Sequence, residues 1–139
     1  MHRADVEDPQ GYGQLAGEYS LALFPYFSLA SGFLAGKYAT RGDLHGVARE
    51  SMVAAYLSDA EHEKAAFAVL DQLRQIAGDH GVEVTSVSLA WLLAKGVTAP
   101  IASARTVDQL GSLLAATELT LTHDEVSALD AASDLFTRD

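Results

Sequence analysis

The chain has 139 residues, 49% of them apolar, and carries a formal net charge of -10 with no cysteine. This length and apolar content predict a single folded domain over residues 1–139, and the lack of cysteine excludes disulfides and thiolate chemistry. The negative charge argues against nucleic acid and anionic membrane as partners. The sequence shows no stretch of about 18 uncharged apolar residues and no leader-like N-terminus, which predicts a cytoplasmic protein.

The first part of the chain contains a weak helical pattern and an apolar run. Residues 9–19 predict a helix that its glycines weaken. The run from Leu21 to Tyr26 is continuously apolar, which is typical of a strand buried on both faces. Residues 28–37 predict a loop or a short helix. Residues 39–50 mix Gly, Asp, Arg and His and predict a mobile loop.

The strongest helical pattern follows a capping-box sequence, Ser-Asp-Ala-Glu, at residues 58–61. The apolar positions after it recur at helical spacing and form one stripe. These positions are Ala66, Val69, Leu70, Leu73, Ile76 and Ala77. Gly78 or Gly81 is expected to end this helix. A second helix is expected to open at Thr85 and to end at Gly96.

Residues 97–102 predict a second buried strand, and residues 107–116 predict a helix after it. The loop between them carries Arg105. The hydroxyl of Thr106 is expected to accept a hydrogen bond from the Gln109 N–H while Gln109 reaches back, as in a capping box. Free N–H groups and the positive end of a helix dipole attract phosphate at such a place. Thr122 is expected to cap the last helix in the same way.

The order strand, helix, strand, helix predicts βαβ units and a parallel sheet covered by helices, an α/β fold. Only two strands are predicted beside about five helices, and a two-stranded parallel sheet leaves both edges open. The chain is therefore expected to be part of a larger α/β fold.

Four segments carry a resemblance to a known family: residues 25–38 (PYFSLASGFLAGKY), 87–94 (VSLAWLLA), 98–110 (TAPIASARTVDQL) and 129–133 (LDAAS). In this order and spacing they resemble the aldo/keto reductases over nearly the whole chain. The resemblance implies the C-terminal fragment of a (β/α)8 TIM barrel, with strands 7 and 8 as two parallel strands and several helices. It also implies NADPH-dependent reduction of aldehydes or ketones to alcohols.

The resemblance further implies a set of NADPH-binding positions. It assigns Tyr26 to stacking on the nicotinamide and Lys37 to the neighbourhood of the phosphates. It assigns Ser103 and Arg105 to the 2′-phosphate, where a guanidinium fork suits a dianion, and Gln109 to the neighbourhood of the adenosine. The positions along the pyrophosphate are Phe27, Ser28, Leu29, Ala30 and Ser31.

Several of these positions also have an ordinary structural interpretation. Tyr26 would be a core aromatic residue at the end of a strand, Lys37 a solvated loop lysine and Gln109 a capping residue. The sequence departs from the family pattern in two places. Phe27-Ser28 stands where many members have Ser-Pro, and Ser112-Leu113 stands where many have Glu-Asn.

No catalytic residue is assigned. The family's Asp, Tyr, Lys and His tetrad lies in the part of the barrel that is expected to precede this chain, and none of the five tyrosines here matches the motif of the proton donor. The histidines show no paired metal spacing, so no metal site is expected. The chain alone is predicted to be inactive. The alternative is a non-catalytic truncated module that binds a nucleotide or associates with itself through exposed strand edges.

Overall fold

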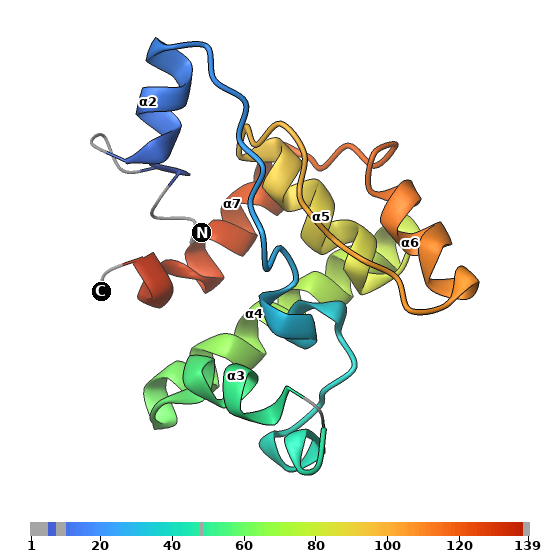
Figure 1. The fold of residues 1–139 in the computed structure, drawn as a ribbon. Coiled ribbons are helices and arrows are strands. Elements are labelled where there is room, and N and C mark those ends of the chain that lie inside the picture. The colour runs from blue at the N-terminus through green and yellow to red at the C-terminus, as the bar shows by residue number, and fades with distance from the viewer. Residues whose placement is uncertain (1–5, 8–10, 48, 138–139) are drawn as a thin grey trace.

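The computed structural model describes residues 6–7, 11–47 and 49–137, and its regular elements over these residues are helices (Figure 1). The α-helices are α2 (Tyr12–Glu18), α3 (Glu50–Ala54), α4 (Ala60–His80), α5 (Val84–Ala94), α6 (Leu110–Ala115) and α7 (His123–Ala132). The short 3-10 helices are η1 (Ala30–Ala35), η2 (Arg41–Leu44), η3 (Ala55–Leu57), η4 (Val107–Gln109) and η5 (Asp134–Thr137). Among the described helices, none combines the length and apolarity that crossing a membrane requires.

Helix α4 is the scaffold on which the other elements pack, with α5 and α7 against it (Figure 1). The Asp59 side chain caps its start by accepting hydrogen bonds of 2.9 and 3.0 Å from two N–H groups of the first turn. Gly81 ends the helix in the left-handed conformation, with φ of 65°. The predicted apolar stripe from Ala66 to Ala77 is buried at every position, which confirms this helix and its inward face.

The core lies along this stripe. Leu70 and Leu73 of α4 are fully buried, as are Leu57 of η3 and Leu129 of α7. Because these side chains come from elements far apart in the sequence, they hold the two halves of the chain together through apolar burial. The core is thus built from helix contacts and not from a sheet.

The prediction of an α/β fold with two parallel strands is wrong. The described residues contain no strand and no sheet. Residues 21–26 and 97–102 are extended and lie side by side, as Figure 1 shows, but they are largely exposed and not buried on both faces. Phe24 and Ile101, for example, are each 55% exposed.

The hydrogen bonds between the two segments explain why they do not form a ladder. The N–H groups of Thr98 and Ile101 donate to the carbonyls of Leu23 and Pro25, at 2.9 Å each. In a parallel ladder, the residues that accept in this way also donate in return. Pro25 has no N–H, and the Leu23 N–H donates to Oγ1 of Thr98 at 2.9 Å. The backbone hydrogen bonds between the two segments therefore run in one direction only, from N–H groups of residues 97–102 to carbonyls of residues 21–26.

Other predicted elements agree in position with helices of the structure. Helix α2 lies within the predicted helix over 9–19, of which residues 9 and 10 lie outside the described residues, and η1 lies within 28–37. The loop at 39–50 contains η2. The cap of α7 is the predicted capping box, because the Glu125 side chain accepts from the Thr122 N–H at 2.7 Å and the Thr122 hydroxyl accepts from the Glu125 N–H at 3.3 Å.

Candidate functional site

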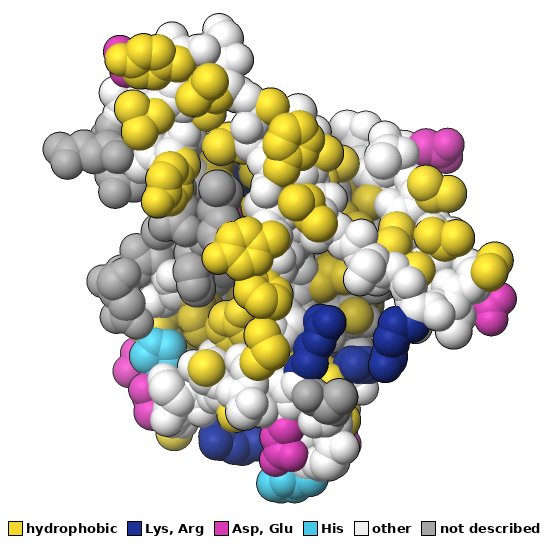
Figure 2. All heavy atoms as spheres, in the orientation of Figure 1, with side chains coloured by type: hydrophobic (Ala, Val, Ile, Leu, Met, Phe, Trp, Pro, Cys, Tyr) yellow, Lys and Arg dark blue, Asp and Glu magenta, His cyan; other side chains and the backbone are white. Residues whose placement is uncertain are grey.

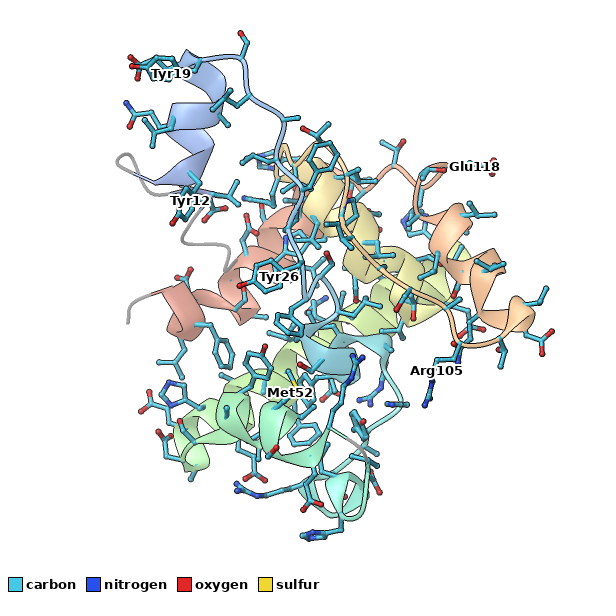
Figure 3. The ribbon with its side chains drawn as sticks, viewed as in Figure 1. Tyr12, Tyr19, Tyr26, Met52, Arg105 and Glu118 are labelled. Atoms are coloured by element: carbon cyan, nitrogen blue, oxygen red, sulfur yellow. The ribbon has the colours of Figure 1, made fainter. Side chains whose placement is uncertain are left out.

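The loop after the first extended segment turns its leading aromatic side chains toward solvent. Tyr26 is 62% exposed and Phe27 50% exposed, with ring centroids 5.0 Å apart. The loop turns sharply because three non-glycine residues take positive φ: Phe27 (57°), Ala30 (46°) and Ser31 (58°). Such values are uncommon outside glycine. The expectation that Tyr26 is a core aromatic residue does not hold here, because its ring lies at the surface near the middle of the view in Figure 3.

The other loop residues predicted to follow a pyrophosphate pack inward. Ser28 and Ser31 are buried, and Leu29 and Ala30 are half-buried. The Ser28 hydroxyl donates to the Pro25 carbonyl at 2.8 Å, so its proton is already engaged within the protein.

Lys37 follows η1 and is exposed. Its Nζ lies 4.9 Å from the centroid of the Tyr38 ring, within cation–π range. The same Nζ would lie 3.8 Å from a Cβ built on Gly32, so the ammonium group sits beside the left-handed loop. The structure thus brings together Lys37 and the loop that begins at Tyr26.

Ser103, Arg105 and Gln109 are exposed on the second loop. The predicted capping box is wrong: the Thr106 side chain makes no cap hydrogen bond, and the Gln109 side chain instead accepts from the Arg105 N–H at 2.9 Å. The cause is local, because the helix opens with the single 3-10 turn η4, and Gln109 then reaches one residue further back. Across the described residues, the Arg105 guanidinium has no hydrogen-bond or ion-pair partner.

Positive side chains gather in one part of the molecular face shown in Figure 2, where several Lys and Arg groups lie beside one another. Arg74 of α4 reaches the carbonyls on both sides of Lys37, which places its guanidinium beside the Lys37 segment. Figure 3 shows the Arg105 side chain extending from its loop toward this same part of the molecule. In a chain with net charge -10, such a gathering is a local exception.

A cavity of about 440 Å³ lies behind the exposed loop, lined mainly by apolar residues that include Tyr26, Phe33 and Trp91. Its cation, Lys95, pairs with Asp130 at 2.8 Å and with Glu7. Burial lowers the pKa of Lys95, but the hydrogen bonds to the two carboxylates outweigh it and the pKa is raised. The charge in this cavity is therefore compensated internally. The described residues hold no group of His, Asp and Glu arranged for a metal ion.

Two parts of this arrangement carry no local sequence signal. The carbonyls that Arg74 contacts lie 38 and 36 positions earlier in the chain. The Trp91 indole N–H donates to Asp130 across 39 positions, at 2.9 Å. Only the folded chain brings these partners together. The one sequence signal that bears on Arg74 is the hydrophobic stripe of α4, which places Arg74 next to the buried Leu73 and hence near the core.

The comparisons with known proteins agree on one family. The sequence model of the aldo/keto reductase family matches residues 6–134. The chain is 28% identical over 112 residues to a versiconal hemiacetal acetate reductase from Aspergillus parasiticus, covering 79% of this chain and 32% of that protein. It is 32% identical over 123 residues to an aldo-keto reductase from Aspergillus calidoustus, covering 86% of this chain and 30% of that protein.

A solved structure has the same fold over part of its length. A glycerol dehydrogenase from Gluconobacter oxydans matches with a TM-score of 0.74 at 19% identity, covering 91% of this chain and 38% of that one. At this identity the likeness concerns the fold alone. The chain spans about a third of the length of these relatives.

Proposed function

The chain belongs to the aldo/keto reductase family, and we propose that it forms the phosphate-binding part of the family's nicotinamide-cofactor site, with NADPH as the cofactor. The observation that carries this proposal is a pair of exposed cations in an acidic chain, Lys37 and Arg105, each of which follows one of the two hydrogen-bonded extended segments. Within the part of the chain that the structure describes, neither pairs with a carboxylate. Because the overall charge repels anions, exposed cations that no carboxylate compensates favour a local anion site.

The surrounding residues fit this cofactor. Arg105 would hold the 2′-phosphate through its planar fork of donors, with Ser103 beside it, and Lys37 would hold the phosphates nearer the loop. The exposed ring of Tyr26 offers a face on which a nicotinamide can stack. Gln109 fits a supporting role, because its side chain holds the backbone of the Arg105 loop.

The reaction we propose for the complete fold is reduction of a carbonyl compound to an alcohol. NADPH would supply the hydride. This chain would bind and orient the cofactor, whereas the proton donor would come from the rest of the fold, since none of the tyrosines here matches the family motif. Purified alone, the chain is expected to bind NADPH without reducing aldehydes.

Fluorescence titration with NADPH tests this function. We expect Lys37→Ala and Arg105→Ala each to weaken binding by about tenfold, as the loss of one charge-assisted hydrogen bond predicts. Lys64→Ala, an exposed lysine of α4, is the matched control. NADH should bind more weakly than NADPH and should not respond to Arg105→Ala, because it lacks the 2′-phosphate. An equal loss in Lys64→Ala would show that only overall charge matters and would refute the assignment.

A second candidate function rests on a different observation. The extended segments expose Leu21 (62%), Phe24 (55%) and Ile101 (55%), and Figure 2 shows apolar side chains running along this face. Adjacent exposed apolar residues favour association. We therefore propose that the isolated chain also associates with a second copy of itself through this face.

A further inference from the structure

Arg74, in the middle of α4, holds the backbone on both sides of Lys37. Its Nη2 donates to the carbonyl of Gly36 at 3.3 Å and to the carbonyl of Tyr38. Its Nη1 donates to Oδ1 of Asp71, one turn earlier on α4, at 2.8 Å. A single guanidinium thus grips the residues before and after Lys37, and a carboxylate on its own helix orients it.

The residues on either side of Lys37 are also seated on the protein. Gly36 has φ of 78°, and a Cβ at this position would lie 2.7 Å from the Cβ of Val84, so only glycine lets the backbone approach α5 this closely. Tyr38 is 3% exposed and stacks on Phe33 with ring centroids 6.2 Å apart. Lys37 alone in this segment projects into solvent, from a backbone fixed on both sides.

We propose that Arg74 is a positioning residue that fixes Lys37 toward the anionic ligand; this rests on the proposed cofactor site. Arg74 acts through Lys37 because the two donor groups described above are already engaged with Gly36, Tyr38 and Asp71. A lysine on a freely moving loop loses side-chain and backbone freedom when it binds a phosphate. Fixing the backbone beforehand removes part of that cost and raises affinity.

Limited trypsin digestion tests, without any nucleotide, whether Arg74 fixes the backbone beside Lys37. Trypsin cuts after Lys37 only when this segment opens, and the cut after Lys64 in α4 reports wider unfolding. In Arg74→Ala we expect the ratio of the Lys37 rate to the Lys64 rate to rise by at least about fivefold. Arg41→Ala is the matched control, since Arg41 also grips a carbonyl, that of Leu57 at 3.1 Å. An unchanged ratio in Arg74→Ala overturns the proposal.

A double-mutant cycle on NADPH affinity tests the consequence. Arg74→Ala should weaken NADPH binding severalfold in the wild-type background and should have no effect in Lys37→Ala. Arg74→Lys, which lacks the second nitrogen that holds Asp71 while the first reaches both carbonyls, should behave like Arg74→Ala. Equal losses in both backgrounds would mean that Arg74 touches the ligand itself and would refute the positioning role. If the wild type does not bind NADPH, the proposed function fails, and the trypsin ratio still decides whether Arg74 fixes Lys37.

Discussion

Replacing Leu70 by alanine tests whether the helical core is fixed in the isolated chain. Leu70 lies in the apolar core and is 0% exposed to solvent. Removing its buried carbons costs about 0.8 kcal/mol for each CH₂ group, and the cavity left behind adds to this, so we expect a loss of about 3 kcal/mol in the free energy of unfolding. A loss of this size is a large part of the free energy of unfolding of a folded domain, which is typically about 5–15 kcal/mol.

Urea unfolding followed by circular dichroism measures this change. With a slope of about 2 kcal/mol/M, the midpoint should fall by about 1.5 M. The matched control is Leu114→Ala on α6, where the side chain is 66% exposed and the same exchange within a helix should change the midpoint little. Equal midpoints for the two variants would refute the reasoning, because they would show that the α4 stripe does not form a specific core.

The other predictions concern caps, pH and association. Thr122→Ala removes the cap of α7 and should cost about 1 kcal/mol, measured by urea unfolding, whereas Thr122→Ser should cost little. Backbone N–H groups lower the pKa of Asp59 and of Glu125 from 3.8 and 4.5. The stabilisation that the two ionised carboxylates give is present above these values and is lost as the pH falls through the lowered pKa values. The urea midpoint should therefore fall on acidification below about pH 4 and stay constant between about pH 6 and pH 8. Phe24→Ser with Ile101→Ser should shift the sedimentation of the chain toward the monomer, and unchanged sedimentation would argue against the associating face.

The helices could be predicted from the sequence because their signals are local. The stripe of α4 follows from a spacing of 3.6 residues within one segment, and the capping box of α7 involves two residues three positions apart. Even so, the residue that caps α4 is Asp59 and not Ser58 of the predicted capping box, because the Asp59 carboxylate accepts the hydrogen bonds of the first-turn N–H groups.

The absence of strands among the described residues could not be predicted from the sequence, because strand formation depends on the partner segment. The apolar run from Leu21 to Tyr26 predicted burial on both faces, but burial depends on which segments lie alongside it. Pro25 argues against a central strand, since proline cannot donate to a ladder, although the apolar run around it favours one. Tyr26, Lys37 and Arg105 lie at the surface, and their roles toward a ligand stay predictions, whereas the hydrogen bonds of Arg74 to the backbone beside Lys37 depend on contacts that only folding creates.

The prolines in the two extended segments have a consequence for aggregation. Stacked fibrils require each chain to donate and accept hydrogen bonds along its whole length to identical chains above and below. Pro25 and Pro100 lie in the apolar stretches of this chain that would otherwise be suited to such stacking, and each removes a donor in every layer. We therefore expect these segments to bind a neighbouring chain without serving as a template for fibril growth.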